Sequence, residues 1–146
     1  MGDAARRHDA SPARQGQLLV KATPFLMFQG QAQGALALYR EAFPDFEQLL
    51  LQEHPSGEMA GQVAMAKIRV GGQEIMLNDS PPVHAFTFTP STSMFVECED
   101  EAQLRGLAEK LGEGGGVLMP IASYDFSTLF TWIADRFGVS WQLNLP

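Results

Sequence analysis

Histidine and carboxylate side chains are the first candidates for chemistry in this sequence. His54 and His84 could bind a divalent metal together with Glu58 and Asp79, because imidazole and carboxylate groups are common ligands of such ions. The two histidines do not lie on one element at a ligand spacing, so surface or capping roles suit their positions better. These residues therefore predict no metal site.

Three glutamates could supply a general base. Glu97 and Glu99 alternate on one face of an expected strand, and Glu74 falls on another strand that could share the same cavity. A carboxylate shielded from water there could accept a proton. Glutamates near strand ends are more often solvated or paired with arginine across the sheet, and we expect that role here.

The remaining reactive side chains do not form a recognisable nucleophilic centre. Ser140 lies in "FGVSW", which lacks the G-x-S-x-G turn of a hydrolase, so we expect a strand hydroxyl. Cys98, the only cysteine, lies in an apolar run and is expected to pack there, which also fits a reducing compartment. Asp135 and Arg136 precede the last strand, where turn and surface roles are expected.

Composition limits the classes of partner. The chain has 146 residues and a formal charge of −7, with no basic stripe interleaved with aromatics, so a nucleic-acid partner is not expected. No apolar run approaches the ~18 residues of a membrane span, and residues 1–20 lack the apolar core of a signal peptide. We expect a cytoplasmic protein with one domain over residues 21–146, preceded by a disordered arm at 1–20.

The elements that would position these residues follow from periodicity and turn signals. Apolar residues at three- and four-residue spacing predict helices over 32–43 and around Leu104–Leu111, and Gly71-Gly72 predicts a hairpin turn. Strands are expected over 21–28, 46–54, 62–70, 73–79, 91–99, 116–123, 129–135 and 139–145.

The second half of this pattern repeats the first. Aligning Gly72 with Gly138 places "GQEIMLN" on "GVSWQLN", and nearly the same offset places Leu36 on Leu104. Each half is a strand, a helix and three strands. We therefore predict an α+β fold of two βαβββ modules, 21–80 and 91–146, joined by a linker over 81–90. Their curved, mixed sheets would form a cup with the helices on the outer face.

The repeat gives the glutamine near the end of the chain an orientation. Since strand side chains alternate, Trp141 and Leu143 would pack under a helix while Gln142 faces the cup. Phe28, Phe95, Trp132 and Met76 could line an apolar pocket there, although aromatics in a small domain are mostly core. The full pocket expected is Leu26, Phe28, Met76, Asn78, Ser91, Ser93, Phe95, Trp132, Ser140 and Gln142.

Several phrases resemble one protein family. They are "TPFLMFQGQAQGALALYREAFP", "FTFTPSTSMFVECEDEAQ", "GGGVLMPIASYDFS" and "FTWIADRFGVSWQLN". These phrases, within two βαβββ modules, resemble the PhnB-like subgroup of the vicinal-oxygen-chelate superfamily, which includes glyoxalase I, extradiol dioxygenases and bleomycin-resistance proteins. Many members of the subgroup are labelled 3-demethylubiquinone-9 3-methyltransferase-like. The resemblance covers residues 21–146.

The resemblance also implies where a metal would bind. Enzymes of the superfamily hold a divalent metal with four side chains, whose places fall near Pro24, Met76, Ser91 and Gln142. None is the histidine or glutamate that metal-binding members use, so no metal cofactor is expected. Methyl transfer is not expected either, because the glycines 114–116 follow a helix and precede a strand, the reverse of a Rossmann dinucleotide site.

The expected function is metal-free binding of a small molecule, apolar or of mixed polarity, which the Gln142 amide would orient. Relatives in the subgroup are typically dimeric, so a homodimer is expected. The alternative is a lyase, isomerase or dioxygenase with an unconventional metal site. A third possibility is a purely structural dimer with a filled cup.

Overall fold

A computed structural model describes residues 19–146, so residues 1–18 of the expected arm lie outside the described part of the chain. Leu19 and Val20 are irregular and exposed. The first module contains β1 (Phe25–Phe28), α1 (Ala32–Ala42), β2 (Glu47–Glu53), β3 (Val63–Val70) and β4 (Gln73–Asp79). The second contains β5 (Ser93–Glu97), α2 (Glu101–Gly112), β6 (Gly116–Tyr124), β7 (Ser127–Ala134) and β8 (Ser140–Leu145).

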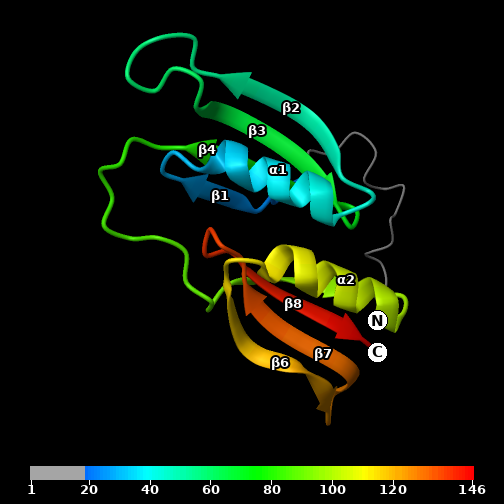
Figure 1. Cartoon of the computed structure of the whole chain (residues 1–146). Coiled ribbons are helices and arrows are strands. Elements are labelled where there is room, and N and C mark those ends of the chain that lie inside the picture. The colour runs from blue at the N-terminus through cyan, green and yellow to red at the C-terminus, as the bar shows by residue number, and fades with distance from the viewer. Residues whose placement is uncertain (1–18) are drawn as a thin grey trace, which may run out of the picture.

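The two modules have the same topology, which confirms the predicted α+β fold. Their four-stranded sheets have the orders β1-β4-β3-β2 and β5-β8-β7-β6 (Figure 1). In each, the first strand runs parallel to the last and the other pairs are antiparallel. The predicted hairpin joins β3 to β4, and Gly71 and Gly72 both have positive φ, which this turn requires.

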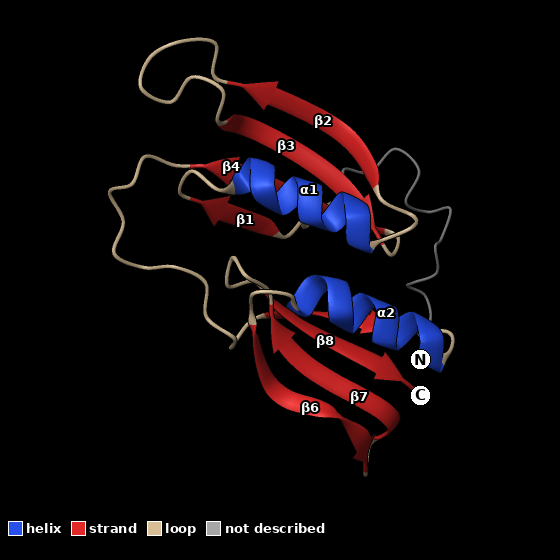
Figure 2. Ribbon diagram, in the orientation of Figure 1, coloured by secondary structure: helices blue, strands red, loops and turns tan. Residues whose placement is uncertain are grey.

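Each helix covers one face of its own sheet (Figure 2). The apolar positions of α1 recur on one side, and Leu36 and Tyr39 are buried with Ile75 and Leu77 of β4. Such an amphipathic face stabilises a short helix mainly by burial against the sheet.

The two modules share one hydrophobic core. The rings of Tyr39 and Phe43 each lie 5.3 Å from the Trp141 ring of β8, and Phe28 lies 6.3 Å from Phe137. The helix-covered faces of both sheets therefore meet across the module boundary. The opposite face of each sheet, which carries no helix, is called its open face below.

Gly115 permits a close approach between two strands. A Cβ atom at this position would lie 2.0 Å from the carbonyl oxygen of Ala134. The glycine run after α2 thus has a packing role where the chain enters β6. Within residues 19–146, the helices are too short and too polar to cross a lipid bilayer.

Candidate functional site

The open face of the second sheet combines aromatic and uncharged polar side chains. The register places them in three rows: Ser93, Ser140 and Ala134; Phe95, Gln142, Trp132 and Met119; Glu97, Asn144, Phe130 and Ala122. Gln142 lies at the centre, between Phe95 on β5 and Trp132 on β7. The glutamine is thus on the open face, with Trp141 and Leu143 packed on the other side.

Hydrogen bonds fix the orientation of the Trp132 ring. Its Nε1 donates to the Ser140 hydroxyl oxygen at 2.8 Å, and the Ser93 and Ser140 hydroxyls lie 2.6 Å apart. Ser140 is only 2% exposed. These three side chains satisfy one another and hold the indole as a rigid wall beside Gln142.

Asn144, on the same face, has a buried side-chain oxygen without a hydrogen-bond donor in the described chain. Its side chain is 8% exposed, and its Oδ1 accepts no hydrogen bond within residues 19–146. Asn78, its counterpart in the repeat, also has a buried Oδ1 without a partner in that part of the chain. Both lie on open faces, opposite Phe130 and Met27 respectively.

Charge distinguishes the two open faces. The rows of the second face include one ionisable side chain, Glu97, and no lysine or arginine among the described residues. An anionic ligand would find no counter-charge there, whereas an uncharged one would meet only amides, hydroxyls and rings.

The open face of the first sheet carries methionines and paired charges. Its rows contain Phe25, Met76, Lys67 and Leu50; Met27 with Asn78, and Met65 with Gln52; and Glu74, Arg69 and Glu47. Glu74 bonds to Lys21 at 2.7 Å and to Arg69 at 3.1 Å, and Arg69 also pairs with Glu47. Hydrogen bonds from Lys21 and Arg69 lower the pKa of Glu74, so this carboxylate is an ion-pair partner rather than a base.

The structure divides the pocket expected from the sequence. Ser93, Phe95, Trp132, Ser140 and Gln142 lie together on the second open face, and Met76 and Asn78 lie on the first.

Leu26 and Phe28 were expected in the pocket but face the core. Leu26 is aligned with Leu77, and both are buried in the core cluster beneath α1. Phe28 is 2% exposed and lies 5.0 Å from the ring of Phe88. The β1–β4 register is the reason: it places Phe25 beside Met76, so Leu26 and Phe28 lie on the opposite face of β1. Ser91 precedes β5 and bonds to Thr89 in the connection.

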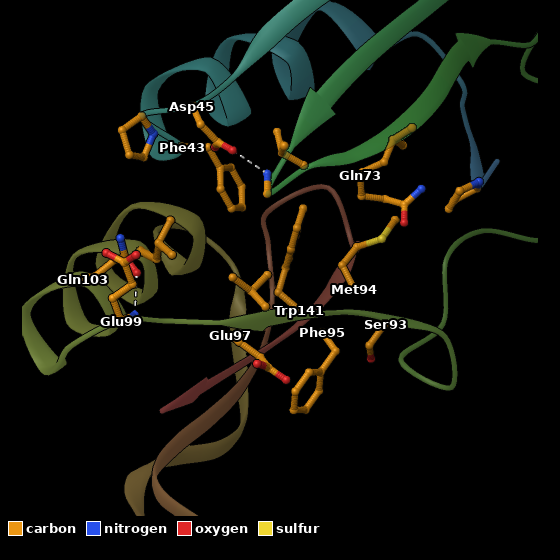
Figure 3. A pocket seen from close by; sticks show the side chains of 17 residues that line it. Phe43, Asp45, Gln73, Ser93, Met94, Phe95, Glu97, Glu99, Gln103 and Trp141 are labelled. Carbon is orange, nitrogen blue, oxygen red and sulfur yellow. Dashed lines mark hydrogen bonds between the residues drawn. The ribbon is translucent and has the colours of Figure 1, made fainter. Parts of the chain in front are cut away.

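A groove of about 750 Å³ lies between the modules. Phe43 and Gln73 line it from the first module, and Met94 and Trp141 from the second (Figure 3). In Figure 3, Met94 and Trp141 point toward the first module, whereas Phe95 points away on the other side of β5. The groove thus borders the shared core, and it touches the expected pocket only at Ser93 and Phe95.

The side chains at the four positions that the sequence resemblance implies for a metal do not fit a hard divalent cation. The carbonyl of Pro24 accepts from the Met76 amide at 2.9 Å, and the Ser91 hydroxyl lies 2.7 Å from that of Thr89. The other two positions hold the thioether of Met76 and the neutral amide of Gln142. None of the four positions therefore supplies a carboxylate or an imidazole. Among residues 19–146, no three histidine, cysteine or acidic side chains group as metal ligands.

The other reactive residues lie apart or have structural roles. His84 stacks on Phe86, with 4.6 Å between the rings, in the linker, whereas His54 follows β2. Asp79 accepts from the backbone amides of Gly30, Ala32 and Val63 at 2.8–3.0 Å, which satisfies the start of α1.

The candidate base Glu99 lies beyond the end of β5, where its amide donates to Gln103. It is therefore not grouped with Glu97 on the strand. Cys98 is buried as expected, and burial raises the pKa of its thiol, which makes it a poorer nucleophile.

The position of Asp135 was also predicted wrongly. It was expected on the surface of a turn, but it is 2% exposed. It accepts from the amides of Phe137 and Val139, the indole of Trp141 and the hydroxyl of Tyr39. Only the amphipathic position of Tyr39 hinted at a buried partner for its hydroxyl.

Comparison with known proteins places these features in context. The family model for 3-demethylubiquinone-9 3-methyltransferase matches residues 20–144. A Bacillus cereus structure described as a 3-demethylubiquinone-9 3-methyltransferase, PhnB protein, is 40% identical, with a TM-score of 0.82; the match covers 87% of this chain and 100% of that one.

Two more distant proteins are also similar to this chain. Protein YjdN of Escherichia coli K12 is 22% identical over 138 residues, which cover 84% of this chain and 93% of that protein. A glyoxalase/bleomycin resistance protein/dioxygenase domain from Frankia shares the fold, with a TM-score of 0.61 and 17% identity, covering 88% of this chain and 98% of that domain.

Proposed function

This chain belongs to the 3-demethylubiquinone-9 3-methyltransferase family, and we propose that it is a PhnB-like protein of the vicinal-oxygen-chelate superfamily that binds a small molecule on the second open face. The protein would work by sequestering its ligand, without a bound metal. A fold of this kind hosts many chemistries, so the proposal depends on the site.

The observation that carries the proposal is the position of Gln142. Its amide lies between the exposed ring of Phe95 and the fixed ring of Trp132, on a face that the helices leave uncovered. Ligand sites are typically lined by apolar side chains with a few convergent polar groups, and the side chains around Gln142 have this composition. The amide can both donate and accept, so it would orient the ligand between the rings.

Two features favour ligand binding over metal chemistry or methyl transfer: the side chains at the expected metal positions and the place of the glycine run. Met76 and Gln142 stand at positions where the sequence resemblance implies metal ligands, and neither side chain is a carboxylate or an imidazole. The glycine run lies between α2 and β6, and Gly115 is explained by its approach to Ala134. A nucleotide-type methyl donor would instead need glycines between a strand and a following helix.

The proposal includes a cytoplasmic homodimer. Phe95 on the second open face is 55% exposed, and Phe25 on the first is 47% exposed. A second copy covering part of these faces would remove apolar surface from water. Sedimentation of the purified protein at micromolar and nanomolar concentrations tests this part independently.

Native mass spectrometry with elemental analysis tests the function. The protein as purified is expected to carry a copurified organic molecule and less than stoichiometric Ni, Zn, Mn or Fe. Gln142→Leu should lose that molecule, while Gln73→Leu, at an exposed position, should retain it. One tightly bound metal ion per chain would instead support an enzyme with an unconventional metal site.

A further inference from the structure

The unpaired amide of Asn144 indicates which chemical group the second open face accepts. Its Oδ1 is buried and accepts no hydrogen bond within the described chain. Leaving a buried polar group without a partner is costly, and such groups in native proteins usually mark a functional or solvent-filled position. A group from outside the described residues is therefore needed to complete it.

No neighbour of Asn144 on this face completes it within the described residues. Glu97, aligned on one side, is an acceptor when ionised, and Phe130, on the other side, has no donor. In the rows beyond, the Trp132 indole N–H is already donated to Ser140. The position thus lacks a donor, not an acceptor.

Aromatic side chains lie in the row of this amide and in the neighbouring rows. Phe130 is 2% exposed, and its ring lies 5.9 Å from Tyr124 and 4.9 Å from Phe126 in edge-on geometry. The locked indole of Trp132 lies in the adjacent row. Phe126 is exposed and Trp132 is half-buried, so these two rings are the ones that an aromatic partner could contact face-on or edge-on.

We infer that the second open face binds an uncharged aromatic molecule whose hydroxyl or amide N–H donates to Oδ1 of Asn144. The inference rests on the proposed function and specifies its ligand class. A carboxylate or phosphate on the ligand would meet no basic side chain among the described residues of this face, and Glu97 would repel it.

Calorimetric titration of the full chain with three matched compounds tests the inference. 2-Naphthol has a hydroxyl donor, 2-methoxynaphthalene has the same rings without the donor, and 2-naphthoate adds a negative charge. The naphthol is expected to bind about tenfold more tightly than the methyl ether, as one hydrogen bond to a buried acceptor would give. The naphthoate should bind more weakly than either.

Asn144→Leu is expected to reduce the ratio of naphthol to ether affinity to about one. Asn78→Leu, the equivalent change on the first open face, should leave it near ten. Should the leucine variant fail to fold, the wild-type protein gives a second readout. Side-chain amide signals of Asn144 and the indole signal of Trp132 should shift in nitrogen–proton NMR spectra with naphthol, more than with the ether.

The outcomes separate this inference from the proposed function. Equal affinities for naphthol and ether, or a ratio that survives Asn144→Leu, would overturn the donor assignment and leave small-molecule binding intact. If none of the three compounds binds, the inference that the ligand is aromatic is wrong. The proposed function fails only if, in addition, the purified protein carries no copurified organic molecule. A dimer dissociation constant raised by Asn144→Leu would assign the amide to a second copy and overturn the inference.

Discussion

The hydroxyl of Tyr39 on α1 donates to Oδ2 of Asp135 at the end of β7, across 2.7 Å of buried space. The same oxygen accepts from the Trp141 indole at 3.0 Å, while Oδ1 accepts two backbone amides. One carboxylate thus joins the helix of the first module to the last strand of the second. Buried charge is tolerated here because each oxygen has donors.

Tyr39→Phe is expected to destabilise the protein by about 1–3 kcal/mol, because a buried charged acceptor loses a donor. Tyr124→Phe is the matched control, since that hydroxyl bonds the Pro120 carbonyl at an exposed position. Urea unfolding followed by circular dichroism gives both values. Equal losses in the two variants would contradict a special role for the Tyr39–Asp135 bond.

Alkaline pH should weaken the same interaction. Burial, and then the charge and hydrogen bond of Asp135, raise the pKa of Tyr39 well above its usual value. The folded state therefore keeps a proton that the unfolded state releases above about pH 10. The stability that Tyr39 contributes is full below that pH and is lost as pH rises toward the folded pKa.

The stability difference between wild type and Tyr39→Phe should therefore shrink between about pH 9 and pH 11. Comparing the two proteins cancels the titration of the lysines and of Tyr124, which both contain. Urea midpoints across this range provide the measurement. A difference that stays constant or grows would show that the folded pKa of Tyr39 is not raised.

Asp79→Asn should cost about 2 kcal/mol, because the carboxylate accepts three backbone amides and an amide side chain offers one oxygen and two competing donors. Asp100→Asn is the control. Asp100 caps α2 by accepting from the Gln103 amide, and asparagine caps helices about as well as aspartate. Thermal unfolding should separate the two variants by several degrees.

Gly115→Ala is expected to destabilise the protein by about 3 kcal/mol or more, since the new Cβ would collide with the Ala134 carbonyl. Gly116→Ala, one residue later, meets open space and should change stability by less than about 0.5 kcal/mol. Chemical denaturation distinguishes them. Similar stabilities would mean that β6 and β7 can separate at this point without cost.

The elements of the fold could be predicted because local signals were strong. The helix predicted over 32–43 spans Ala32–Ala42, and the strand predicted over 73–79 matches β4 residue for residue. The repeat added long-range information, since Leu36 and Leu104 fall at equivalent, buried positions of α1 and α2.

The site was predicted less completely because strand register is not local. Alternation placed Gln142 correctly opposite Trp141, but it could not say which residue of β1 stands beside Met76. The face of β1 that lies beside Met76 begins at Phe25, one residue away from the face that was expected, so Leu26 and Phe28 lie in the core. The burial of Asp135 was missed for a similar reason, as its partner Tyr39 lies 96 residues away.

The packing of Tyr39 and Phe43 on Trp141 has a consequence for unfolding. Although the sequence is a duplication, the helix-covered face of each half is completed by the other half. An isolated half would expose these rings to water, so the two copies cannot melt independently. Differential scanning calorimetry should therefore show a single peak, with a calorimetric enthalpy equal to the van't Hoff enthalpy.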